Sequence, residues 1–269
     1  MAWWKAWSEA EGRSVTGALN FDPAPDAQTL YKAMKGLGTD EQAIIDVLTK
    51  RSNMQRQQIA KSFKGQFGKD LIESLKSELS GNFERLIVAL MYSPFKYDAK
   101  ELHDAMKGER DNATLYVDTA RALQDAETLY AAGEKIRGTD EMQFITILCT
   151  RSATHLLKVF EEYQKLANKS IEDTIKSETH GSLEDAMLAI VKCTRNVHCY
   201  FAERLYHALK GAGTHDGTLI RVIVSRSEVD LNLIKAEFKR IAGKSLSSMI
   251  LDDTSGDYKT ALLNLCGSD

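Results

Sequence analysis

Apolar residues recur at steps of three or four along almost the whole chain. Leu71, Leu75 and Leu79 form one such row, and similar short rows precede and follow it. This spacing places the apolar side chains on one face of a helix, and each row covers only a few helical turns. Only three prolines interrupt the chain, so the pattern predicts an all-α protein built from short helices.

Two short motifs indicate where helices should begin. Ser52 followed by Gln55, and Thr39 followed by Gln42, have the spacing of a capping box. In such a box the first residue caps the helix and the later one bonds back to it. We therefore expect one helix to start just after Ser52 and another just after Thr39.

One longer pattern occurs three times. A glycine turn ends in Gly-Thr, and an acidic residue follows forty positions after that glycine. The pairs are Gly38 with Glu78, Gly138 with Glu178, and Gly213 with Asp253. Around each pair the apolar rows predict five short helices in a unit of about seventy residues, which is typical of a repeat protein.

The copies divide the chain into segments. Asp98 to Asp111 opens like a further unit, but Glu109 and Arg110 stand where its glycine turn should be. We interpret this stretch as a one-helix remnant followed by a polar connector over 109–124. The predicted organisation is a tail at 1–24, a first repeat at 25–92, the remnant of a second repeat with its connector at 97–124, a third repeat at 125–195 and a fourth repeat at 200–267.

The charge balance narrows the choice of partners. The formal net charge is -3 and the pI is about 6.1, which predicts no binding to nucleic acid, because that requires a basic surface. An acidic protein is also repelled by an acidic membrane unless a cation bridges the two. The apolar rows are too short to span a bilayer, so any membrane contact should be peripheral.

Cysteines and known catalytic motifs add little. Four cysteines are scattered along a chain without a signal-peptide pattern, which predicts reduced thiols and a cytoplasmic location. Cys193, His198 and Cys199 do not have the spacing of a zinc site. The chain contains no metalloprotease, nucleophile-elbow or P-loop motif, so we expect no enzymatic activity.

The repeated turn has the chemistry of a calcium site. Calcium takes oxygen ligands, and alternating glycines allow positive φ, so that successive carbonyls can point inward. In the first repeat we expect the ion to be bound by the carbonyls of Met34, Gly36 and Gly38 and by the carboxylate of Glu78. A single turn of this kind is usually only a helix end followed by a helix start. Three copies with one fixed acid position favour the metal site.

The segments MKGLGTDE with KSEL, GEKIRGTDE with SETHGS, and LKGAGTHD with DDTSGDY resemble the calcium-binding repeats of the annexin family. The resemblance covers essentially the entire chain. It implies five-helix repeats, calcium sites on a convex face, and reversible, calcium-dependent binding to acidic phospholipid membranes. By position it implies Ca²⁺ ligands in three turns: Met34, Gly36 and Gly38 with Glu78; Gly133, Ile136 and Gly138 with Glu178; and Leu209, Gly211 and Gly213 with Asp253.

The chain departs from the annexin pattern in its second repeat. Annexins normally have four repeats, with the second and third packed as one module and the first and fourth as the other. Most of the second is missing here, so we expect the third repeat to lack its usual partner and to expose part of an apolar face. An alternative function follows, namely a helical protein-interaction scaffold or an impaired, shortened annexin with little lipid binding.

Three tryptophans, Trp3, Trp4 and Trp7, lie close together in the tail. Tryptophan favours surfaces that are partly wet and partly apolar. We expect this tail to dock on the protein itself, and contact with a protein partner or with lipid is the alternative. The sequence leaves the oligomeric state open.

Overall fold

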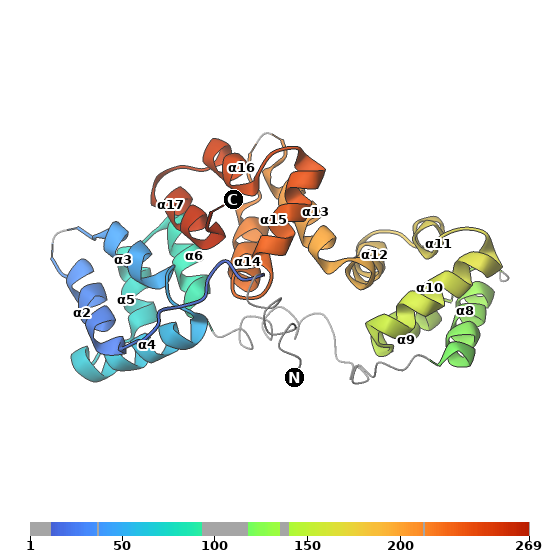
Figure 1. The fold of residues 1–269 in the computed structure, drawn as a ribbon, viewed down its shortest axis with the longest axis horizontal. Coiled ribbons are helices and arrows are strands. Elements are labelled where there is room, and N and C mark those ends of the chain that lie inside the picture. The colour runs from blue at the N-terminus through green and yellow to red at the C-terminus, as the bar shows by residue number, and fades with distance from the viewer. Residues whose placement is uncertain (1–11, 37, 93–117, 135–139, 212, 269) are drawn as a thin grey trace. The chain divides into compact units, whose positions relative to one another are not determined.

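The computed structural model describes residues 12–36, 38–92, 118–134, 140–211 and 213–268. Within these residues every regular element is an α-helix, which confirms the predicted all-α class. The chain divides into two compact units, drawn in Figure 1. Unit 1 consists of Met1–Ala105 and Phe201–Asp269, and unit 2 of Met106–Tyr200.

Each of the three repeats has five described helices, as the apolar rows predicted. The first repeat contains α2 (Pro23–Ala33), α3 (Glu41–Leu48), α4 (Asn53–Phe67), α5 (Leu71–Glu78) and α6 (Gly81–Met91). The third contains α8 (Thr119–Glu134), α9 (Glu141–Thr150), α10 (Ala153–Ala167), α11 (Ile171–Glu178) and α12 (Ser182–Arg195). The fourth contains α13 (Val197–Leu209), α14 (Asp216–Arg226), α15 (Leu231–Ala242), α16 (Leu246–Asp253) and α17 (Gly256–Cys266).

Side-chain caps explain where several helices begin. Ser52 accepts a hydrogen bond from the Gln55 backbone N–H, and the Gln55 side chain accepts one from the Ser52 N–H, so the capping box predicted for α4 is confirmed. The box predicted at Thr39 is wrong, because Asp40 caps α3 by accepting a bond from the Ala43 N–H at 3.0 Å. The Thr39 hydroxyl is therefore available for a contact outside the helix.

Two helix starts differ from the predicted segment boundaries. α2 begins at Pro23, where Asp22 caps the first turn. Proline suits this position because the backbone N–H that it lacks would have no acceptor within the helix. α8 begins at Thr119, so the connector expected up to residue 124 is helical from that point. The remnant at Asp98 to Asp111 and the tail tryptophans lie outside the described residues.

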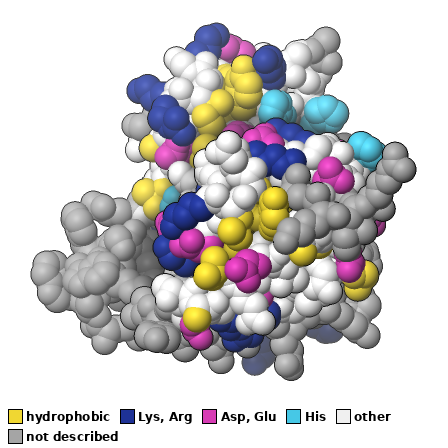
Figure 2. All heavy atoms as spheres, turned by 90° about the vertical axis from the view of Figure 1, so that its right-hand side faces the viewer, with side chains coloured by type: hydrophobic (Ala, Val, Ile, Leu, Met, Phe, Trp, Pro, Cys, Tyr) yellow, Lys and Arg dark blue, Asp and Glu magenta, His cyan; other side chains and the backbone are white. Residues whose placement is uncertain are grey.

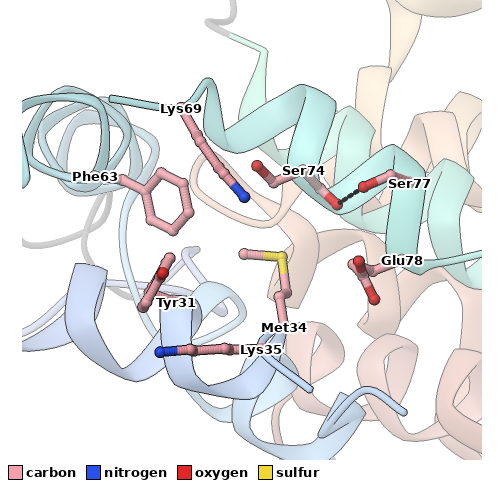
Figure 3. A pocket seen from close by; sticks show the side chains of 8 residues that line it. All are labelled: Tyr31, Met34, Lys35, Phe63, Lys69, Ser74, Ser77 and Glu78. Carbon is pink, nitrogen blue, oxygen red and sulfur yellow. Dashed lines mark hydrogen bonds between the residues drawn. The ribbon is translucent and has the colours of Figure 1, made fainter. Parts of the chain in front are cut away.

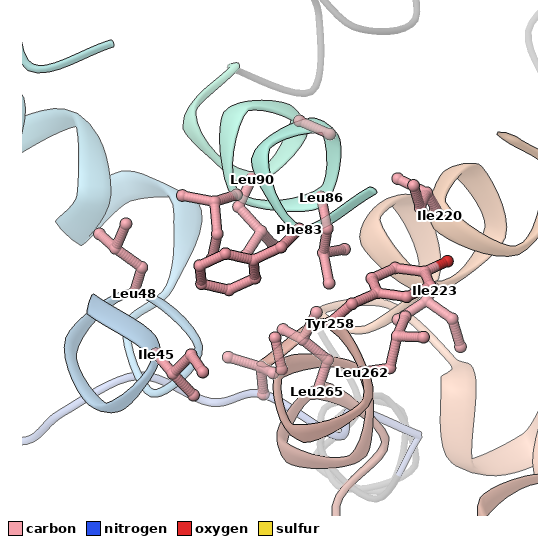
Figure 4. Packing of buried hydrophobic residues seen from close by; sticks show 14 of the residues in the cluster. Ile45, Leu48, Phe83, Leu86, Leu90, Ile220, Ile223, Tyr258, Leu262 and Leu265 are labelled. Carbon is pink, nitrogen blue, oxygen red and sulfur yellow. The ribbon is translucent and has the colours of Figure 1, made fainter. Parts of the chain in front are cut away.

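The core of unit 1 joins the first and fourth repeats. α6 packs against α14, and α17 packs against α3 and α6. Leu86, Leu90, Ile223 and Leu265 are fully buried in this core (Figure 4). Two repeats that are far apart in the sequence therefore share one hydrophobic core.

One buried arginine connects helix ends within this core. Arg56 is only 1% exposed. Its Nε donates to the Leu90 carbonyl at 2.9 Å, its Nη1 donates to the Leu48 carbonyl at 3.0 Å, and its Nη2 donates to Oε1 of Glu228 at 2.6 Å. Burial lowers the pKa of Arg56, and the Glu228 carboxylate opposes that shift. The pair ties the first repeat to the fourth while satisfying carbonyls at two helix ends.

The segment that precedes α2 lies across both repeats of unit 1. The Ser14 N–H donates to the Ser227 carbonyl at 2.8 Å, and Val15 is buried in the core. A few residues later the Ala18 N–H donates to Oε1 of Gln55 at 3.0 Å, and Nε2 of Gln55 donates back to the Ala18 carbonyl at 2.7 Å. This segment therefore adds a second connection between the first and fourth repeats.

Unit 2 has a separate hydrophobic core with a polar network at its edge. Arg151 Nε donates to Asp125 at 2.8 Å, and His155 Nε2 lies 2.8 Å from the same carboxylate oxygen. Burial opposes ionisation of Asp125, but the hydrogen bonds from Arg151 and His155 outweigh it and lower the pKa of this carboxyl. The network links α8 to α10, the most extensively packed helix pair of unit 2.

One face of the molecule mixes apolar and charged side chains. On the face drawn in Figure 2, hydrophobic side chains gather in small groups between Lys, Arg, Asp and Glu. The longest described helix, α8, has 16 residues, and none in the described part of the chain is long and apolar enough to cross a bilayer.

Candidate metal centre

The glycine turn of the first repeat connects α2 to α3. The Asp40 N–H donates to the Ala33 carbonyl at 2.9 Å and closes the turn. Thr39 Oγ1 donates to Oε2 of Glu78 at 3.1 Å, across 39 positions of sequence. The turn and the acid that the sequence paired by spacing therefore lie side by side.

The glycines of these turns have the backbone conformation that the sequence predicted. Gly36 and Gly38 have φ values of +127° and +88°, and Gly211 and Gly213 have +122° and +102°. A Cβ added at any of the four would meet no atom within 4 Å. Glycine is required here by backbone conformation, because side chains disfavour positive φ, and space is not the constraint.

The three predicted acidic ligands occupy one structural position, because each is the last residue of an eight-residue helix. Glu78 ends α5, Glu178 ends α11 and Asp253 ends α16. A helix C-terminus carries partial negative charge, so a carboxylate there is unfavourable by about 0.3–1 kcal/mol unless a cation lies nearby. The fixed spacing in the sequence therefore places one carboxylate at the negative end of a helix beside each turn.

A small hollow brings the first turn and its acid together. Met34 and Glu78 line the same pocket of about 100 Å³, in which their side chains lie next to each other (Figure 3). Lys35 and Lys69 line it as well, and Lys35 Nζ lies 5.6 Å from the Tyr31 ring centroid. The pocket thus combines a carboxylate with two ammonium groups beside the turn.

The fourth repeat has a corresponding hollow of about 330 Å³. Its lining includes Leu209, Lys210, Gly211, Lys244 and Asp253. The His215 N–H donates to the Ala208 carbonyl at 2.9 Å and closes the turn, as in the first repeat. Thr214 Oγ1 donates to the backbone carbonyl of Asp253 at 3.4 Å. The threonine therefore holds the end of α16 here, whereas Thr39 holds the carboxylate itself.

The turn of the third repeat is longer by one residue. The Asp140 N–H donates to the Ala132 carbonyl at 3.1 Å. In the first repeat the matching hydrogen bond joins Asp40 to Ala33, which are one residue closer to each other in the sequence. Ile136 and Gly138, two of the predicted ligands, lie outside the described residues. Glu178 is half-buried at the end of α11.

Gly133, the remaining predicted ligand of this turn, has another reason to be glycine. It is buried within the last turn of α8, and a Cβ there would lie 3.1 Å from Thr174 Cγ2 and 3.3 Å from Phe144 Cζ. Close packing excludes a larger residue at this position. Positive φ was therefore the correct expectation for the turns of the first and fourth repeats, and Gly133 serves packing.

Lysines border these pockets, and the calcium-type pattern of the sequence did not single them out. Lys69 and Lys244 follow the left-handed residues that end α4 and α15. Lys169 follows the left-handed Asn168 at the end of α10. The recurrence of lysine at one position in all three copies was the signal that could have identified them.

The residues at these turns fit calcium better than a softer metal. Among the described residues no three His, Cys, Asp or Glu side chains gather as a metal-binding group. Each predicted site has one carboxylate, and its other protein ligands would be backbone carbonyls. An all-oxygen set with positive-φ glycines suits calcium, which accepts carbonyls and carboxylates in a flexible geometry.

Comparison with known proteins identifies the family of these repeats. A sequence model of the annexin family matches residues 25–90, 124–190 and 200–265. Human annexin A8 is 64% identical over an alignment of 326 positions that covers 100% of both chains. This chain has only 269 residues, so part of annexin A8 has no counterpart here.

Solved structures show the same likeness. The structure of a mutant of annexin A8 with an intact N-terminus superimposes with a TM-score of 0.87 at 63% identity, covering 96% of this chain and 98% of that chain. A calcium-bound annexin, annexin (Sm)1, superimposes with a TM-score of 0.80 at 27% identity, covering 95% and 93%.

Proposed function

Because this chain belongs to the annexin family, whose known property is calcium-dependent phospholipid binding, we propose that it binds acidic phospholipid membranes reversibly through its three glycine turns. The units that do so are the repeats at 25–92, 125–195 and 200–267. The binding is peripheral and takes place at the cytoplasmic side of a membrane. Annexins are in general not enzymes, and the proposal assigns no catalytic step to the chain.

The observation that carries this proposal is the placement of an acid at the C-terminus of a short helix beside each turn. Glu78, Glu178 and Asp253 all occupy that position, which a helix by itself disfavours. In the first repeat Thr39 also orients the carboxylate by a hydrogen bond. A cation bound between turn and acid would remove the electrostatic penalty at each of these helix ends.

The proposed ligands in each repeat are three carbonyls and one carboxylate. These are Met34, Gly36 and Gly38 with Glu78; Gly133, Ile136 and Gly138 with Glu178; and Leu209, Gly211 and Gly213 with Asp253. One carboxylate per site gives weak affinity without lipid, since affinity for calcium rises with ligand charge. When bound, calcium supplies the positive charge that joins an acidic protein to lipid phosphate.

The lysines at the pockets add a second contribution. Lys35 and Lys69 border the first turn, and Lys210 and Lys244 border the fourth. Ammonium groups at this position attract anionic lipid headgroups by about 1 kcal/mol each near a membrane surface. They offset the repulsion that a net charge of -3 would otherwise cause.

Co-sedimentation with phosphatidylserine liposomes across a calcium series, with reversal by chelator, tests the proposal. The triple variant Glu78→Gln, Glu178→Gln and Asp253→Asn keeps the shape of the acids and removes their charge. We expect it to lose calcium-dependent binding. Calcium-dependent binding at the wild-type level in this variant would refute the proposal.

A matched control changes one acid in each repeat away from the turns. Asp46→Asn, Glu161→Gln and Glu237→Gln remove the same total charge from ion pairs at the surface of α3, α10 and α15. We expect this control to bind liposomes as the wild type does. A loss of binding in both triple variants would assign the effect to net charge.

The second candidate function is a helical protein-interaction scaffold. It is favoured by the part of annexin A8 that has no counterpart in this chain. A scaffold would stay in the supernatant at every calcium concentration, whereas the membrane-binding protein moves to the liposomes.

A further inference from the structure

The two repeats of unit 1 pack with a two-fold relationship. The second helix of the fourth repeat, α14, packs on the fifth helix of the first, α6; reciprocally, α17 packs on α3. The two fifth helices, α6 and α17, also pack on each other. Each repeat therefore offers the same face to the other, which is the pattern of an isologous interface.

Four positions make up this face in each repeat of unit 1. In the first repeat they are Ile45, Phe83, Leu86 and Leu90, and in the fourth they are Ile220, Tyr258, Ala261 and Leu265. All eight side chains are between 0% and 9% exposed. Figure 4 shows most of them meeting between α3, α6, α14 and α17.

The third repeat has the same four positions, but none of them is buried. They are Ile145 on α9 and Leu183, Ala186 and Ile190 on α12, and we call them the pairing face. Ile145, Leu183 and Ile190 are half-buried, and Ala186 is exposed. Phe144 and Val191, on the same two helices, are instead buried in the core of unit 2, so the pairing face is distinct from that core.

We propose that the pairing face binds the pairing face of a second copy of this chain. The two copies would form a symmetric dimer in which α9 of each packs on α12 of the other and the two α12 helices pack together. This arrangement would reproduce, between two chains, the helix packing that joins the first and fourth repeats within unit 1. It does not depend on calcium or lipid and is independent of the proposed function.

A second copy suits this face because a symmetric contact would not bury an unpaired charge at the positions that carry the ion pair in unit 1. In unit 1 the interface also holds the pair of Arg56 and Glu228. The matching positions of the third repeat are Leu156 and Ala153. A symmetric contact of the third repeat with itself therefore brings together only small and apolar groups at these positions.

The rim of the interface differs in charge from that of unit 1. Arg85 Nη2 lies 3.4 Å from the place of a Cβ on Gly217, and the matching residues of the third repeat are Asp185 and Met142. Asp185 of one copy would therefore lie close to Met142 and its neighbour Glu141 of the other. These exposed acids repel each other, and salt screens exposed charges, so we expect the dimer to tighten as ionic strength rises.

Sedimentation velocity of the full chain over a concentration series, in chelator and without lipid, tests the proposal. Excess reductant prevents disulfides, because Cys149 and Cys193 lie on α9 and α12. We expect the mass to rise from the monomer value of 30.0 kDa towards twice that value as concentration increases. A protein that stays monomeric throughout refutes the proposal, including the case in which another segment of the chain covers the face.

Substitutions on the face locate the contact. Ala186→Glu should weaken association by more than about tenfold, because burying a carboxylate in each copy costs more than the ~1.4 kcal/mol that a tenfold change represents. Ala186 is exposed, so the variant should fold, which circular dichroism checks. Leu157→Glu, at a residue 39% exposed on α10, is the matched control and should leave association unchanged.

A gain of affinity provides an independent check. Asp185→Arg reproduces the charge of Arg85 at the rim and should tighten the dimer several-fold at low salt. Hydrogen exchange should show that peptides of α9 and α12 become protected as concentration rises. A dimer that is indifferent to Ala186→Glu and Asp185→Arg, or that protects other helices instead, overturns the assignment.

Discussion

Replacing Arg56 by leucine should be among the most damaging single changes in unit 1. The side chain is 1% exposed and donates to the carbonyls of Leu48 and Leu90 and to Glu228. Removing one partner of a buried ion pair costs about 3–5 kcal/mol, because the other charge loses its compensation. The Glu228 side chain is 26% exposed, so water can reach part of it. We therefore expect a loss near 3 kcal/mol.

The third repeat suggests how the loss can be reduced. It has Leu156 and Ala153 where unit 1 has Arg56 and Glu228, so it manages without either charge. The double variant R56L/E228A should therefore be less destabilised than the sum of the two single variants. We expect a coupling free energy of about 1–3 kcal/mol, within the range seen for residues in direct contact.

Urea unfolding followed by circular dichroism, with hydrogen exchange of α4 and α6, measures the effect on unit 1. Tryptophan fluorescence is unsuitable, because all three tryptophans lie in the tail. Arg240→Met is the control, since the exposed pair of Arg240 with Glu237 should contribute less than about 1 kcal/mol. A loss below about 1 kcal/mol for R56L, or additive losses in the double variant, would refute the reasoning.

Three further changes test other parts of the structure. Thr39→Val should weaken calcium-dependent lipid binding by about 0.5–1.5 kcal/mol, the usual net value of a hydrogen bond. Thr214→Val should have a smaller effect, because the Thr214 hydrogen bond is longer and its acceptor is a backbone carbonyl. Calcium titrations with liposomes compare the two variants. Gly133→Ala should destabilise unit 2 by about 1–3 kcal/mol through overpacking. Gly65→Ala, in a helix with open space around this position, should instead stabilise unit 1 by about 0.5–1 kcal/mol. Hydrogen exchange measures the stability of the two units separately. The pKa of Asp125 is lowered in the folded state, so its contribution to stability is present above its unfolded pKa and is lost as the pH falls through the folded pKa. Thermal melts of unit 2 should therefore lose stability below about pH 4 in the wild type but much less in Asp125→Asn.

The repeated pattern of the sequence predicted the fold well because one simple signal was present three times. Rows such as Leu71, Leu75 and Leu79 indicate which side of a helix is buried, because the spacing of apolar residues within a short segment determines that side. The forty-residue spacing predicted that Glu78 would meet its turn, and the Thr39 hydrogen bond shows that it does. Spacing alone did not reveal that the acid ends a helix, which only the helix bounds show.

The expectations that failed involve choices between neighbouring residues. Thr39 and Asp40 can both cap a helix, and the sequence did not show that Asp40 does so while Thr39 bonds to the acid. Gly133 resembles a turn glycine in sequence, but glycine is required there because Thr174 and Phe144 lie too close for a larger residue. Contacts between residues far apart in the chain decide both cases, and a local pattern does not contain them.

The acids at the helix ends should have opposite effects on stability and on binding. Without calcium, Glu78 lies at the negative end of α5, so Glu78→Gln should stabilise the calcium-free protein by up to about 1 kcal/mol. The same change removes the only carboxylate proposed for that turn, so it should weaken calcium-dependent binding. The comparison is with Glu73→Gln in the first turn of α5, where the negative charge is favourable and its removal should destabilise. If Glu78→Gln lowers both stability in chelator and binding, the acid is a structural residue, and its place at the helix end does not indicate a cation site.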